Sequence, residues 1–186
     1  GWISAERVMD GLVGRMNDKG KFQEDCRLLE IEIPPSTLHA GREELLAGVR
    51  SAFASHPTLM LRMTRSAGGL GNRAFASLDA FELWLSSITD GDPWLGQPVL
   101  VEPILPVLRA LTSLLRIEDS GPLFLGHGER RIVDSKESAG CVFPGEFDGT
   151  LAGRLAQSAL QLGSLAHERG YRGWLDIDWG TLADGT

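Results

Sequence analysis

The sequence contains few cysteines and histidines, and neither type is arranged as a metal site. Its two cysteines, Cys26 and Cys141, stand far apart and lack the paired spacing of zinc ligands. None of the four histidines has a second histidine four residues away, so a helical zinc motif is excluded as well. We therefore expect two reduced thiols, as in a reducing cytoplasm, rather than a disulfide or a zinc centre.

Long apolar runs and an excess of positive charge are also missing. No apolar run is long enough to span a bilayer, and the start "GWISAERVMD" lacks the basic-then-apolar order of a signal peptide. The net charge is −7, with the acidic residues scattered along the chain. This distribution excludes the broad basic surface of a nucleic-acid-binding protein. We expect a cytoplasmic protein without membrane or nucleic-acid partners, in which a small anionic ligand needs a local positive site.

What is present is a mixed pattern of helix-like and strand-like segments. Apolar spacing of three and four residues predicts helices, and short apolar or alternating runs predict strands. Helices are expected at residues 4–16, 17–33, 41–57, 77–88 and 149–170; strands are expected at 58–64, 98–105 and 172–180, with an antiparallel hairpin at 108–133. This order favours an α+β fold over regular βαβ alternation.

The stretch "LMLRMTRSAGGLGNRAF" (59–75) contains a glycine loop that has three interpretations. A Walker-type phosphate loop is excluded, because no Gly-Lys-Ser/Thr follows the glycines. "GLGNRA" fits the dinucleotide pattern G-x-G-x-x-A, with Asp90 about twenty residues on, and that interpretation expects a helix from Asn72. Alternatively, glycine N–H groups wrap phosphate oxygens, with Arg62 at the base of the loop and a strand over residues 73–76. The loop could also be a plain hairpin turn beside a surface arginine.

Four segments stand out in chain order: "NDKGKFQEDCRLLEIEIPPS", "LMLRMTRSAGGLGN", "PVLVEPIL" and "GYRGWLDIDWGTLADG". Together they resemble motifs of the ATP-grasp superfamily of ATP-dependent carboxylate–amine ligases, and the resemblance covers residues 17–186. It implies two α+β lobes that clamp a nucleotide. The expected divisions are an N-terminal helical segment (1–57), a glycine-loop lobe (58–97) and a C-terminal ATP-grasp lobe (98–186).

The resemblance also implies a role for particular residues. Lys19 matches a lysine that reaches the ATP phosphates, and Arg62 stands where most members have a lysine, as a catalytic and ATP-binding residue. Glu102 matches the acid that accepts a hydrogen bond from the adenine amino group, and Asp178 matches the first magnesium ligand. The remaining expected ATP-binding residues are the flap glycines Gly68, Gly69 and Gly71, together with the ring-edge residues Pro103, Ile104 and Leu105.

Some positions depart from the family pattern or have a second interpretation. Asp176 stands where a glycine is usual, and Lys136 is a candidate contact to the terminal phosphate or the acceptor substrate. The family's other magnesium ligands, a glutamate and an asparagine, belong to a strand that would follow Thr186. Glu102 could instead pair with Arg109 or Arg116. Lys19 and Asp178 could also be ordinary solvated residues.

The function that the resemblance implies is ATP-dependent ligation, with ATP and Mg²⁺ as cofactors. A small-molecule carboxylate is activated as an acyl-phosphate, which a small-molecule amine attacks to form an amide or peptide bond. Two alternatives remain open. One is a non-catalytic ATP-binding module that regulates a partner, and the other is a dinucleotide-binding oxidoreductase.

Overall fold

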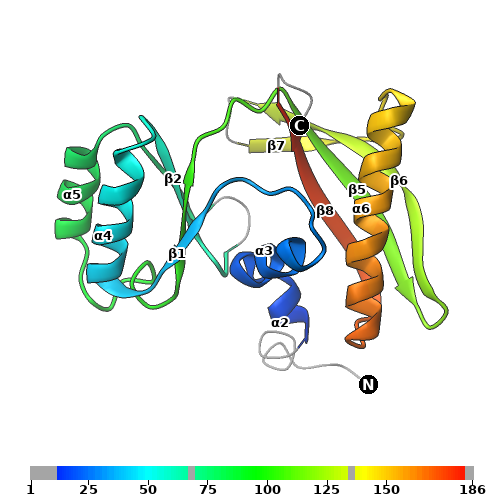
Figure 1. Ribbon diagram of the computed structural model, residues 1–186, viewed down its shortest axis with the longest axis horizontal. Helices are drawn as coiled ribbons and strands as arrows, with labels where there is room; N and C mark the ends of the chain where they lie inside the picture. The colour runs from blue at the N-terminus through cyan, green and yellow to red at the C-terminus, as the bar shows by residue number, and fades with distance from the viewer. Residues whose placement is uncertain (1–11, 67–69, 134–136, 183–186) are drawn as a thin grey trace. The chain divides into compact units, whose positions relative to one another are not determined.

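A computed structural model describes residues 12–66, 70–133 and 137–182 of the chain (Figure 1). Contacts between these residues divide them into two compact units. The N-terminal unit comprises residues 16–27 and 32–105, and the C-terminal unit comprises residues 106–182 with 12–15 and 28–31. In the part of the chain that is described, no helix is long and apolar enough to cross a membrane.

The N-terminal unit is a four-stranded antiparallel sheet with helices against it. Its strands are β1 (Thr37–His39), β2 (Leu59–Met63), β3 (Asn72–Phe75) and β4 (Val99–Pro103), in the order β1-β4-β2-β3. Its helices are α3 (Lys19–Leu28), α4 (Gly41–Phe53) and α5 (Leu78–Ser87). β1 lies within the segment 1–57, for which only helices were expected, and it adds a strand to the sheet by pairing with β4.

The core of this unit lies between one face of the sheet and the helices α4 and α5, which Figure 1 shows side by side. Side chains alternate along a strand, so Leu59 and Leu61 of β2 enter this core while Arg62 lies on the opposite face. Arg62 is the register partner of Leu100 on β4, so the two side chains lie on the same face of the sheet. Glu102, two residues further along β4, lies on that face as well. The sheet thus separates an apolar core from a face that carries charged residues.

Local signals explain where the helices of this unit begin. Asp18 accepts hydrogen bonds from the N–H groups of Gly20 and Lys21 and so caps α3. The side chain of Ser77 accepts from the N–H of Ala80 and caps α5. α3 ends at Leu28, five residues before the end of the helix that was expected at residues 17–33.

The C-terminal unit is a second four-stranded antiparallel sheet covered by one long helix. Its strands are β5 (Arg109–Glu118), β6 (Gly121–Val133), β7 (Glu137–Val142) and β8 (Gly173–Thr181), in the order β7-β6-β5-β8. The helix α6 (Gly149–Glu168) lies along one face of the sheet (Figure 1), and its apolar face includes Leu155, Ala159, Leu162 and Ala166. The short helix α2 (Leu12–Met16) precedes α3. The expected hairpin at 108–133 is confirmed as β5 and β6.

Candidate nucleotide site

A buried carboxylate occupies the charged face of the N-terminal sheet. Glu102 lies on the central strand β4 and is 5% exposed. Its Oε2 lies 2.9 Å from Arg62 Nε on β2, and its Oε1 accepts a 2.9 Å hydrogen bond from Gln23 Nε2 on α3. Arg62 Nε is itself buried, and its N–H does not point at the carboxylate well enough to make a hydrogen bond. The contact is therefore a close ion pair, with the arginine N–H poorly satisfied.

The environment of Glu102 opposes its negative charge. Burial raises the pKa of the Glu102 carboxyl above its ordinary value, while the charge of Arg62, the hydrogen bond from Gln23 and the charge of Lys19 partly lower it. The alternative partners Arg109 and Arg116 are excluded, because they pair with Glu129 at 2.7 Å and with Glu118 at 3.3 Å. The interpretation of Glu102 as paired with either of them is thus wrong.

Gln23 belongs to this cluster, although the sequence analysis did not single it out. Its Oε1 accepts hydrogen bonds from Ser36 Oγ and, at 3.2 Å, from Arg27 Nη2, so its NH₂ group is turned toward Glu102. The sequence does contain one indication that Gln23 lies near Lys19, which is its four-residue spacing from Lys19. Lys19, Gln23 and Arg27 follow one another at four-residue intervals, which places them on one face of α3.

Lys19 lies at the base of the glycine loop. Its ammonium group donates to Ser66 O at 2.8 Å and to Ser66 Oγ at 3.0 Å, and Met63 O lies 3.3 Å away. Burial and then the positive charge of Arg62 lower the pKa of Lys19, while Asp18 and Glu102 raise it. Lys19 is therefore no ordinary solvated lysine: it is half-buried and shares its surroundings with a second cation.

The glycine loop connects the two strands of a hairpin. β2 and β3 pair antiparallel from Leu59–Phe75 to Arg62–Asn72, and Gly71 O accepts from Met63 N at 2.8 Å. A Cβ at Gly71 would lie 2.2 Å from Ser66 Oγ, so this position has no room for a side chain. Gly68 and Gly69 lie outside the described residues.

This hairpin corrects the dinucleotide interpretation of the loop. That interpretation required a helix from Asn72, but residues 72–75 form β3 and the next helix, α5, begins at Leu78. The expectation that a strand resumes after the loop is confirmed. The helix fails because Asn72–Phe75 find backbone partners on β2, which override the apolar spacing that suggested a helix.

The three ring-edge residues come at the end of β4. Pro103 is the last residue of the strand and pairs in register with Leu59. The N–H of Ile104 donates to Thr58 O at 3.2 Å, so this group is already used within the unit. Leu105 is the last residue of the N-terminal unit.

Asp178 and Asp176 belong to the C-terminal unit, on the face of the sheet opposite α6. Arg130 Nη2 lies 2.6 Å from Asp178 Oδ1 and 3.3 Å from Asp176 Oδ2, and Asp176 also accepts a hydrogen bond from Thr112 Oγ1. The described residues bring together no group of three His, Cys, Asp or Glu side chains that could hold a metal ion. Asp178 is thus paired with an arginine rather than poised in a ready metal site, and Lys136 lies outside the described residues.

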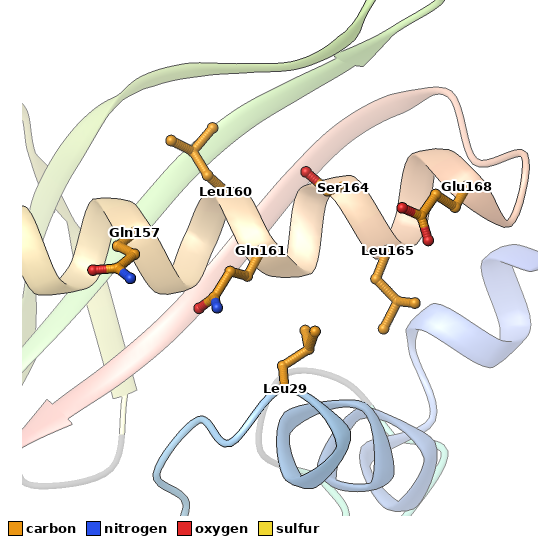
Figure 2. Close-up of a pocket in the computed structure, with 7 residues that line it drawn as sticks. All are labelled: Leu29, Gln157, Leu160, Gln161, Ser164, Leu165 and Glu168. Atoms are coloured by element: carbon orange, nitrogen blue, oxygen red, sulfur yellow. The ribbon is translucent and has the colours of Figure 1, made fainter.

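A groove of about 590 Å³ lies elsewhere on the C-terminal unit, along α6 (Figure 2). Leu29 points toward Gln161 and Leu165 of the helix, and Glu168 is the one charged residue in its lining. None of the residues expected to bind ATP or metal lines this groove. Its composition offers no cation for a phosphate group, so it is not a candidate nucleotide site.

No family model matches the sequence, and no curated protein matches it. Solved structures do match its fold. D-alanyl-alanine synthetase A from Vibrio cholerae superposes with a TM-score of 0.75 at 12% identity, over 94% of this chain and 53% of that one. An ADP complex of PurK, an N5-carboxyaminoimidazole ribonucleotide synthetase, gives a TM-score of 0.73 at 16% identity, over 94% and 43%.

The biotin carboxylase domain of the Hydrogenobacter thermophilus 2-oxoglutarate carboxylase, solved with MgADP and bicarbonate, gives a TM-score of 0.76 at 13% identity. That match covers 94% of this chain and 39% of the domain. The chain therefore spans about half or less of the length of these proteins. All three are ATP-grasp enzymes, and their domains share the mixed α+β architecture of this chain. The chain has the ATP-grasp fold that its four sequence motifs implied.

Proposed function

We propose that this chain is part of an ATP-dependent ligase that activates a carboxylate as an acyl-phosphate for attack by an amine. The observation that carries the proposal is the cluster of Lys19, Arg62 and the buried Glu102, which stand at three positions of the ATP-grasp motifs. The proteins that share the fold support a nucleotide as ligand, since the PurK and biotin carboxylase structures contain ADP.

The two cations of the cluster suit a triphosphate. Burial and the positive charge of Arg62 lower the pKa of Lys19, and an anion nearby would relieve the repulsion between the two cations. The guanidinium of Arg62 offers a fork of donors, and the Arg62 side chain is 40% exposed. We propose that Lys19 and Arg62 bind phosphate oxygens, and that Gly68, Gly69 and Gly71 cover them from the loop.

Glu102 and the last residues of β4 would bind the adenine ring of ATP. The carboxylate of Glu102 would accept from the adenine amino group, and the backbone of Pro103, Ile104 and Leu105 would meet the ring edge. Since both oxygens of Glu102 already contact Arg62 or Gln23, the adenine would share an oxygen with one of these donors. A carboxylate oxygen has two lone pairs, so this sharing is chemically reasonable.

A carboxylate does not react directly with an amine, because its oxygen is a poor leaving group, and phosphorylation makes that oxygen a good one. Transfer of the terminal phosphoryl group of ATP to a carboxylate oxygen gives an acyl-phosphate and ADP. The amine then attacks the carbonyl carbon, and phosphate leaves. Arg62 would act here by neutralising charge on the transferring group, which is the main task of a protein in phosphoryl transfer. Magnesium would accompany ATP and offset the remaining phosphate charge, with Asp178 as a proposed ligand.

A non-catalytic ATP-binding module is a second candidate, favoured by one observation. Asp178 is held by Arg130, and the described residues offer no ready site of three ligands for a metal ion. In that case the chain binds nucleotide but transfers no phosphoryl group. ADP formation that depends on an added carboxylate supports the ligase, whereas nucleotide binding without turnover supports the module.

Calorimetric titration with ATP tests the proposed site. We expect Lys19→Met and Arg62→Met each to weaken ATP binding by about 1–3 kcal/mol, the usual range for a hydrogen bond to a charged group. Lys21→Met is the matched control, because Lys21 lies on the same helix and pairs with Glu24 at the surface. NAD should not bind. Equal losses in Lys19→Met and Lys21→Met would reject the proposed site.

A further inference from the structure

A directional chain of hydrogen bonds runs from the surface of the N-terminal unit to the buried carboxylate of Glu102. Arg27 Nη2 donates to Ser36 Oγ at 3.1 Å, and the Ser36 hydroxyl donates to Gln23 Oε1. Gln23 Nε2 then donates to Glu102 Oε1 at 2.9 Å. Arg27 is exposed, whereas Gln23 and Glu102 are 6% and 5% exposed. The chain therefore begins at a cation in solvent and ends at a buried anion, with every donor directed toward Glu102.

The orientation of the Gln23 amide is fixed by the groups at its outer end. Its Oε1 accepts from Ser36 Oγ and also, at 3.2 Å, from Arg27 Nη2. A reversed amide would turn its NH₂ group toward the guanidinium, which can only donate, and its oxygen toward the carboxylate of Glu102, which accepts. Gln23 is therefore held as a donor toward Glu102.

A fixed donor at Gln23 keeps Glu102 as an acceptor of hydrogen bonds. Burial raises the pKa of the Glu102 carboxyl, and the charge of Arg62 and then the hydrogen bond from Gln23 oppose that rise. An ionised carboxylate accepts hydrogen bonds and donates none, whereas a protonated carboxyl can donate one. A ligand group that contacts the ionised carboxylate must therefore itself be a donor.

We propose that Gln23 is a positioning residue that holds Glu102 as an acceptor, so that the site selects a purine with an amino group at C6 and rejects one with a carbonyl there. The inference rests on the proposed function, in which Glu102 contacts the adenine ring. Adenine carries an amino donor at C6. Hypoxanthine and guanine carry a carbonyl oxygen, which would face the carboxylate with no proton between the two acceptors. Gln23 acts through Glu102, since its Nε2 already donates to that carboxylate.

Inosine triphosphate, which has a carbonyl where ATP has the amino group, tests this inference. In calorimetric titrations we expect the unsubstituted chain to bind ATP at least about tenfold more tightly than inosine triphosphate. Gln23→Met has a similar length and no N–H, and it should reduce this ratio at least about threefold, because the carboxylate loses the donor that orients it. The affinity for inorganic tripolyphosphate should change by less than about twofold. Gln23→Lys keeps a donor and should preserve more of the ratio.

Two further variants separate positioning from a general loss of structure. If Gln23 acts through Glu102, adding Gln23→Met to Glu102→Gln should change the ratio by less than about 1.5-fold. Gln97→Met is the matched control, because Gln97 belongs to the same unit and accepts from Arg65 N at 2.8 Å rather than contacting Glu102. Its ratio should stay within about twofold of that of the unsubstituted chain. Circular dichroism would confirm that each variant keeps its helices.

A second readout needs no nucleotide. The pKa of the Glu102 carboxyl can be followed by ¹³C NMR of labelled glutamate, with Glu102→Gln identifying the signal. This pKa should rise in Gln23→Met and stay unchanged in Gln97→Met. The inference is overturned if Gln23→Met leaves either this pKa or the preference for ATP unchanged while ATP still binds. If neither ATP nor tripolyphosphate binds to the unsubstituted chain, the proposed function fails, and this selectivity fails with it.

Discussion

Removal of the Arg62 charge should destabilise the N-terminal unit in a way that depends on pH. In Arg62→Met the buried carboxylate of Glu102 keeps its hydrogen bond from Gln23 but loses its ion-pair partner. Breaking a fully buried pair costs about 3–5 kcal/mol. The Arg62 side chain is 40% exposed, so solvent screens part of this interaction and we expect a smaller loss of about 1–3 kcal/mol.

The sign of the pH dependence follows from the Glu102 carboxyl. Its pKa is already raised in the folded protein by burial, and the loss of Arg62, the largest opposing contribution, raises it further. A raised carboxyl pKa means that the folded state binds the proton more tightly than the unfolded state. The stability associated with this group is therefore present below the ordinary pKa of 4.5 and decreases as pH rises through the folded pKa.

Urea unfolding at about pH 4.5 and about pH 8 measures this effect. We expect the destabilisation by Arg62→Met to be clearly larger at the higher pH, where Glu102 is charged. Arg50→Met is the matched control, since Arg50 pairs at 2.7 Å with Glu82 and both side chains are exposed. It should cost less than about 1 kcal/mol at either pH. The reasoning is refuted if Arg62→Met costs the same at both pH values, or no more than Arg50→Met.

Three further predictions concern the rest of the chain. Gly163→Ala should lower the melting temperature, because the new Cβ would lie 2.9 Å from Pro122 Cβ. Gly153→Ala on the same helix has no such neighbour and should stabilise the fold by about 0.5–1 kcal/mol. The opposite order in a calorimetric melt would contradict this packing. Ser77→Ala should cost about 1 kcal/mol in urea unfolding by removing the cap of α5, and no loss would argue against that cap. A thiol reagent should label Cys141 in the folded chain and Cys26 only after unfolding. Cys26 is buried, and burial raises the pKa of its thiol to about 11, so rapid labelling of both cysteines would contradict this burial.

Features that depend on nearby residues could be predicted from the sequence. Asp18 and Ser77, which cap α3 and α5, are of residue types that favour helix N-caps, and the apolar spacing of residues 149–170 predicted α6. The two alternating runs around the turn at residues 118–122 predicted the β5–β6 hairpin. Each of these signals needs only residues that are close together in the chain.

Contacts between distant segments could not be predicted in the same way. Gln23 and Glu102 are separated by 79 positions, and their hydrogen bond depends on how α3 packs against the sheet. The sequence motifs predicted that Glu102 binds the adenine amino group. They could not show that Glu102 also contacts Arg62 and Gln23. The ion pairs of Arg130 with Asp176 and Asp178 likewise depend on β8 pairing with β5. This pairing places the two aspartates within reach of Arg130 on β6, a strand that is not adjacent to β8.

Hydrogen–deuterium exchange with and without ATP tests the central claim most directly. If Lys19, Arg62 and Glu102 form the nucleotide site, ATP should slow amide exchange in residues 59–66 and 99–105, and Lys19→Met should remove that protection. Protection that appears only elsewhere in the chain, or that survives Lys19→Met together with Arg62→Met, would contradict the assignment of the nucleotide to this cluster.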